Sequence, residues 1–149
     1  MRIRPATRDD VPAIVRMLAD DALGSTRERY VDPLPAEYWA AWDAIERDQN
    51  QLLIVAEVDG TAAGVLQITF IPGLTRLGSW RAQIEGVRID SARRGLGLGE
   101  VMVTWAVEEA RRRGCRLIQL TTDKQRGDAH RFYERLGFVA THEGMKREL

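Results

Sequence analysis

The chain has 149 residues, of which 44% are hydrophobic and 30% are charged, and this is enough apolar material for one domain with its own core. Its 22 Lys and Arg balance its 22 Asp and Glu, which argues against nucleic acid or membrane partners bound through overall charge. The chain has a single cysteine and two histidines, so we expect neither a disulfide nor a metal site. It lacks an apolar stretch long enough for a bilayer span or a secretion signal, and we therefore expect a cytoplasmic domain.

Apolar periodicity predicts alternating helices and strands along the chain. The first helix follows an N-cap at Thr7 and keeps an apolar face at helical spacing as far as Ala19. Asp59-Gly60, a pair that favours a tight turn, separates two apolar runs and predicts an antiparallel hairpin. Later, a helix between two apolar strands predicts a βαβ unit with parallel strands. In chain order we expect a strand near Ile3, helices over 8–19 and 37–50, strands over 52–58, 62–70 and 81–89, a helix over 97–113, a strand over 116–122, a helix over 127–136, and closing strands after Gly137 and Gly144.

This order, β-α-α-β-β-β-α-β-α-β-β, predicts an α+β fold. We expect a single domain over residues 1–149, built on one mixed, mostly antiparallel sheet flanked by helices. Residues 20–50 carry five more acidic than basic side chains, whereas the segment from Arg76 to the C-terminus carries five more basic than acidic ones. This asymmetry fits either two differently charged ligand surfaces or an unevenly charged solvated surface.

The segment between the strand over 81–89 and the next helix carries the most informative pattern. Gly95, Gly97 and Gly99 alternate with leucines and leave backbone N–H groups accessible at a helix N-terminus, where a phosphate binds well. Arg93 and Arg94 stand beside them and could pair with the phosphate oxygens. The glycines would also suit a tight strand-to-helix turn without a ligand.

A pyrophosphate cradle would narrow the ligand to nucleotides, dinucleotides or coenzyme A. No Gly-Lys-Ser/Thr follows, which excludes a Walker-type loop, and Gly-x-Gly-x-Gly differs from the Gly-x-Gly-x-x-Gly of dinucleotide sites. Asp123 lies at the end of the next strand, about where a ribose-binding acid would be expected. Too little chain follows for the further βα units of that fold, so a dinucleotide oxidoreductase is disfavoured.

Three segments together resemble the GNAT superfamily of N-acetyltransferases: residues 84–89 (IEGVRI), 94–99 (RGLGLG) and 129–138 (AHRFYERLGF). The element order is similar to that family's fold across nearly the whole chain. The resemblance implies acetyl-CoA as co-substrate and a splayed parallel strand pair whose gap holds the pantetheine arm. Gly86 would supply the bulge that this break in the ladder needs. The residues assigned to the coenzyme in this way are Val87, Arg88, Ile89, Arg93, Arg94, Gly95, Leu96, Gly97, Leu98, Gly99, Asp123 and Arg126.

The resemblance also implies the catalytic groups. Glu85 matches a glutamate that accepts the proton of the acceptor amine, and Tyr133 matches the tyrosine that protonates the departing thiolate. Glu85 would otherwise be an ordinary strand carboxylate, and Tyr133 a core aromatic. Many members carry an asparagine shortly before residue 129, whereas this chain has none there and offers Asp123. Cys115 follows a helix that would place it about 25 Å from the glycines, so we expect direct attack by the amine without an acetyl-enzyme.

In the family the amine binds opposite the coenzyme, through segments that match residues 23–39 and 142–146. Acidic side chains of the first segment, Glu28 among them, would favour a cationic small amine, and Trp80 would border the acceptor site or a dimer contact. We expect acetyl transfer from acetyl-CoA to a primary amine of a small or amino-acid-like molecule. A protein-lysine or N-terminal acetyltransferase, a non-catalytic acyl-CoA-binding module and a homodimer stay open.

Overall fold

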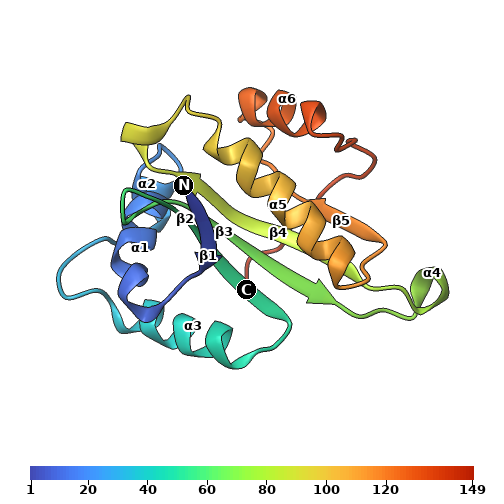
Figure 1. Cartoon of the computed structure of the whole chain (residues 1–149), viewed down its shortest axis with the longest axis horizontal. Coiled ribbons are helices and arrows are strands. Elements are labelled where there is room, and N and C mark those ends of the chain that lie inside the picture. Colours follow the sequence, from blue (N-terminus) through green and yellow to red (C-terminus); the bar gives the residue numbers. More distant parts are fainter.

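Five strands form one mixed sheet in the order β1-β2-β3-β4-β5, in a computed structural model that describes residues 1–149 (Figure 1). The first four strands pair antiparallel and the last two pair parallel, which confirms the predicted α+β fold and its βαβ unit. None of the helices combines the length and apolar character needed to cross a lipid bilayer. The elements are β1 (Arg2–Pro5), η1 (Arg8–Asp10), α1 (Val11–Ala19), α2 (Gly24–Arg27), α3 (Ala36–Arg47), β2 (Gln51–Val58), β3 (Thr61–Ile71), α4 (Thr75–Gly78), β4 (Arg81–Ile89), η2 (Ser91–Arg93), α5 (Leu98–Arg112), β5 (Leu117–Leu120) and α6 (Gly127–Arg135).

The prediction of two closing strands is wrong. No strand follows α6, and β5 is the edge of the sheet. The side chains of Val139 and Met145 are 77% and 94% exposed. Apolar residues are too sparse after Phe138 to alternate with polar ones, so this segment lacks the half-buried face that a strand needs.

Thr7 and Asp10 determine where the first helical segment begins. The Asp10 carboxylate accepts hydrogen bonds from the Thr7 backbone N–H at 2.8 Å and from its hydroxyl at 3.0 Å. The same carboxylate forms an ion pair of 2.6 Å with Arg4 of β1. This confirms Thr7 as the N-cap, although the helix opens with the 3₁₀ turn η1 before α1.

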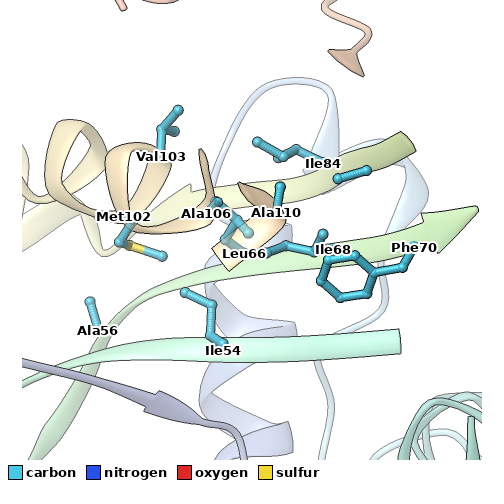
Figure 2. Packing of buried hydrophobic residues seen from close by; sticks show 11 residues of the cluster. Ile54, Ala56, Leu66, Ile68, Phe70, Ile84, Met102, Val103, Ala106 and Ala110 are labelled. Atoms are coloured by element: carbon cyan, nitrogen blue, oxygen red, sulfur yellow. The ribbon is translucent and has the colours of Figure 1, made fainter. Parts of the chain in front are cut away.

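Alternate residues of the central strands face helices on opposite sides of the sheet. Leu66 belongs to a cluster that includes Met102 of α5 (Figure 2). Its neighbour Val65 packs in a second cluster with Met17 of α1. The helices α5 and α1 therefore lie on opposite faces, which are called the α5 face and the α1 face below.

The strand β4 changes its pairing midway. Its ladder with β5 runs only from Arg81 to Ile84, so the parallel pair opens beyond Ile84 as predicted. On its other side the register with β3 shifts between Glu85 and Arg88. Gly86 lies in this shift with φ of 63°, a conformation that favours glycine. The expected bulge at Gly86 is therefore confirmed.

Candidate active site

The bulge decides which side chains of β4 share a face. Arg88 lies opposite Val65 of β3, and Glu85 lies opposite Gln67. Directly opposed residues in an antiparallel pair point to the same face, as do residues two apart within a strand. Since Val65 packs against α1, both Glu85 and Arg88 lie on the α1 face.

The other residues of this part of β4 point the opposite way. Val87 and Ile89 pack against the core cluster that contains Met102 of α5. Beyond Ile84 neither residue has a partner on β5. The backbone of β4 is thus open toward the gap, while its hydrophobic side chains hold it to the α5 face.

The loop between β4 and α5 has a strongly curved backbone at two of its glycines. Gly95 and Gly97 have φ of 79° and 75°, and a Cβ at either position would meet nothing within 4 Å. Gly97 is the N-cap of α5, so the first N–H groups of this helix carry the positive end of its dipole. Gly99 has a different role, because a Cβ there would lie 3.4 Å from the ring of Phe132. The loop therefore suits a pyrophosphate at Gly95 and Gly97, and close packing of α5 against α6 at Gly99.

The leucines and arginines of this loop divide between core and solvent. Leu98 is buried at the start of α5, whereas Leu96 is 65% exposed. Arg93 forms an ion pair of 3.3 Å with Asp59 of the β2–β3 turn. Arg94 donates to the backbone carbonyl oxygens of Asp20 at 3.0 Å and of Ile89 at 3.4 Å. Half of the Arg94 side chain is exposed, so its guanidinium can also contact a ligand at the loop.

Three charged residues from distant parts of the chain meet beside the opening of β4. Asp21, just after α1, places its Oδ2 3.1 Å from Arg88 Nε and 2.9 Å from Arg126 Nη2. Its Oδ1 accepts the Gly24 N–H at 2.6 Å. With Val87, Ile89 and Arg94 these three residues line an open hollow of about 310 Å³. Asp21 was not among the predicted site residues, since no local motif connects it with positions 67 and 105 residues away.

Burial and charge act in opposite directions in this cluster, which we call the Arg88–Asp21–Arg126 cluster. Burial alone would raise the pKa of Asp21, but the Gly24 N–H and the charges of Arg88 and Arg126 together hold it below its usual 3.8. Burial lowers the pKa of Arg88, and the Asp21 carboxylate counteracts this only in part. The cluster is therefore ionised at neutral pH, with two cations and one anion.

Tyr133 lies on α6 close to the same opening. Its ring makes edge-to-face contacts with Phe132 and Phe138, at centroid distances of 5.1 and 5.8 Å. Burial raises the pKa of Tyr133 above its usual 10.0, although the charges of Arg88 and Arg126 act to lower it. The phenol therefore keeps its proton at neutral pH and can donate it.

The two predicted carboxylates occupy different settings. Glu85 is exposed on the α1 face, at the point where β4 separates from β5. Asp123 organises the turn before α6, because its Oδ1 accepts the Gln125 N–H and its carbonyl accepts the Arg126 N–H, both at 2.9 Å. Asp123 thus helps to place Arg126.

The structure changes two expectations about the acceptor side. Asp21, the acidic residue that lines the hollow, is paired with two arginines, and Glu28 of the expected acidic segment accepts a hydrogen bond of 2.7 Å from the Tyr38 hydroxyl. The hollow is consequently basic. Trp80 does not border it, since it lies with Cys115 at the far end of β4, and nine residues of strand separate the two ends by about 27 Å.

A mixed sheet that opens between its parallel strands, next to a glycine loop that begins a helix, is the fold of the N-acetyltransferases that the sequence resembles. The comparisons with known proteins agree. The chain belongs to the acetyltransferase (GNAT) family, whose model matches residues 15–138.

Three relatives illustrate the range of this likeness. A crystal structure described as a transcriptional regulator from Bacillus halodurans C-125 is 57% identical, covers 99% of both chains and has a TM-score of 0.97. The aminoalkylphosphonate N-acetyltransferase of Salmonella typhimurium is 39% identical over 64 residues, 43% of this chain and 42% of that enzyme. The glucosamine 6-phosphate N-acetyltransferase of Trypanosoma brucei brucei is 32% identical over 90 residues, 60% of this chain and 59% of that enzyme. The chain therefore spans less than two thirds of either enzyme.

Proposed function

We propose that the protein transfers the acetyl group of acetyl-CoA to the primary amine of a small molecule. The observation that carries this proposal is the opening of β4 away from β5 directly before the glycine loop. The residues present fit coenzyme A: the backbone at Val87 and Ile89 has no partner on β5, and Gly95 and Gly97 leave room for phosphate oxygens above their N–H groups. The coenzyme supplies an acetyl thioester, which is activated toward an amine.

The residues of the chain can bind, polarise and move protons around that thioester. The Val87 N–H would donate a hydrogen bond to the acetyl carbonyl oxygen, where negative charge develops. Glu85 would accept the proton that the amine loses as its nitrogen forms the new C–N bond. Tyr133 would donate its proton to the sulfur as the C–S bond breaks, so that both products leave neutral at the reacting atoms.

The acceptor is inferred from two observations. The hollow beside the opening of β4 is small, at about 310 Å³, which suits a metabolite better than a folded protein surface. The enzymes named above as relatives from Salmonella typhimurium and Trypanosoma brucei brucei carry small amines in their names. A non-catalytic acyl-CoA-binding module is the second candidate, because the 57% identical relative is described as a regulator.

The test combines coenzyme binding with thiol release in the presence of small amines. Glu85→Gln and Tyr133→Phe should each lower kcat about 100-fold or more and leave the KM for acetyl-CoA within about twofold. Glu108→Gln, an exposed carboxylate on α5, serves as the matched control and should change neither constant. Coenzyme binding without thiol release from any amine would favour the binding module. A protein that binds neither acetyl-CoA nor CoA would refute both candidates.

A further inference from the structure

We propose that the acceptor molecule carries an oxyanion as well as its amine, and that the side chains of Arg88 and Arg126 bind this oxyanion. The inference specifies the substrate of the acetyl transfer proposed above and rests on it. It assigns to the acceptor two side chains that the family resemblance places with the coenzyme.

The net charge of the Arg88–Asp21–Arg126 cluster favours an anionic ligand. Arg88 and Arg126 share the single carboxylate of Asp21, which leaves one net positive charge in a partly buried place. Asp21 is itself held by the Gly24 N–H, so it need not move when a ligand enters. One ligand oxyanion would make the cluster neutral, which is the arrangement that buried charges favour.

The two arginines also keep hydrogen-bond donors that the protein does not use. A guanidinium has five N–H donors in a planar fork that matches phosphate and carboxylate oxygens. Within the protein, Arg88 uses one of them for the Val87 carbonyl at 2.8 Å, and Arg126 uses one for Asp21 at 2.9 Å. The Nε of Arg88 is buried and faces Asp21 Oδ2 at 3.1 Å. The donors that remain for a ligand are therefore those of the Arg88 Nη atoms.

The pleat of β4 groups Arg88 with Glu85. Arg88 and Glu85 lie together on the α1 face, whereas Val87, Ile89 and the start of α5 lie on the α5 face. Arg88 thus borders the hollow from the α1 face, whereas Val87 and Ile89 border it from the α5 face. The oxyanion at Arg88 and an amine at Glu85 would belong to one molecule on the α1 face.

The spacing of Glu85 and Arg88 limits the length of the acceptor. Glu85 and Arg88 lie opposite Gln67 and Val65, two residues apart on β3, which corresponds to about 7 Å along the strand. Because the Arg88 side chain is long, its guanidinium can lie closer to the Glu85 carboxylate than this backbone spacing. The acceptor that fits is therefore short, with a few bonds between its amine and its phosphate, phosphonate or carboxylate group.

The experiment compares acceptors that differ only in the oxyanion. O-phosphoethanolamine is compared with ethanolamine, and β-alanine with its amide, by thiol release from acetyl-CoA. The wild-type protein should prefer the anionic member of at least one pair by tenfold or more in kcat/KM. The phosphate and carboxylate pairs show which oxyanion is preferred. Arg126→Gln should reduce that preference to less than threefold. Arg88→Lys should reduce it to less than half of its wild-type value. Neither variant should change the KM for acetyl-CoA. Arg47→Gln, an exposed arginine of α3, is the control that keeps the preference.

Each outcome is informative. Equal rates for anionic and neutral acceptors overturn the inference while acetyl transfer itself stands. A rise in the KM for acetyl-CoA in Arg126→Gln, without a change in acceptor preference, also overturns it and returns the arginine to the coenzyme. If no amine releases thiol, the proposed function fails, and calorimetric titration with O-phosphoethanolamine then tests the oxyanion site by itself. Binding that is lost in Arg126→Gln would support this site. The absence of binding to the wild-type protein would refute it.

Discussion

The three glycines of the loop should respond differently to the same substitution. Gly97→Ala places a side chain at φ of 75°, where an L-residue costs about 1–2 kcal/mol. The reduced freedom of the unfolded chain offsets roughly 0.4–1 kcal/mol of this cost. Gly99→Ala lies inside α5 with no positive φ, and its Cβ would contact Phe132 at 3.4 Å. Alanine is better than glycine in a helix by about 0.5–1 kcal/mol, so this variant should be as stable as the wild type or more so.

The predicted difference between the two variants is therefore about 1–2 kcal/mol, or roughly 4 °C in Tm for a chain of this size. Gly97→Ala should also raise the KM for acetyl-CoA, because it changes the direction of the first N–H groups of α5. Gly99→Ala should leave this KM unchanged, since its N–H is retained and its Cβ faces Phe132.

Thermal unfolding followed by circular dichroism, with and without CoA, measures the first difference, and initial rates measure the second. Gly114→Ala is the matched control, because Gly114 has φ of 78° and open space around it at the far end of α5. It should lose stability as Gly97→Ala does and keep the KM for acetyl-CoA. A Gly99→Ala variant as impaired as Gly97→Ala in both measurements would refute the assignment of separate roles.

Three further predictions concern stability and the single thiol. The hydrogen bonds and ion pair with Arg4 hold the pKa of Asp10 below its usual 3.8. The contribution of Asp10 to folding stability is therefore present above about pH 4 and is lost as the pH falls through the lowered pKa. Asp10→Asn should lower the free energy of unfolding in urea by about 2 kcal/mol at pH 7, and this difference from the wild type should shrink in acid. Met102 has no exposed surface, and Met102→Ala should cost about 2–5 kcal/mol in the same assay. Burial raises the pKa of Cys115 above 9.0, so iodoacetamide should modify it roughly tenfold more slowly in the folded protein than in urea. Cys115→Ser should leave the rate of acetyl transfer unchanged. A loss of activity in this variant would argue for an acetyl-enzyme.

Local patterns were sufficient to predict most of the fold. The turn at Asp59-Gly60 and the helix between two apolar strands each depend on residues that are close in sequence, whereas the bulge at Gly86 was implied by the family resemblance. Such features follow from backbone preference and periodicity, which the sequence displays directly. The prediction of closing strands failed because the residues around Val139 and Met145 lack the alternating apolar pattern of a half-buried strand.

The candidate site was predictable only in part, because its parts come together through tertiary structure. The glycine loop and Tyr133 are recognisable within short motifs. The pairing of Asp21 with Arg126 joins residues 105 positions apart, and the excess of acidic residues around Asp21 suggested an acidic mouth instead. Net charge per segment cannot show which acids are paired across the fold. The sequence does not distinguish Gly99 from Gly95 and Gly97, because the contact of Gly99 with Phe132 depends on tertiary structure.

The bulge at Gly86 connects the two halves of the proposed chemistry. Ile84 faces α5, and strict alternation from there would direct Gly86 and Arg88 toward the α5 face and Val87 away from it. The extra residue reverses this order, so Val87 and Ile89 join the core on the α5 face, while Arg88 returns to the face of Glu85 and α1. It does so beside the point where β5 ceases to pair. In the proposed function, a single inserted glycine would thereby give β4 one face for the coenzyme and the opposite face for a charged acceptor.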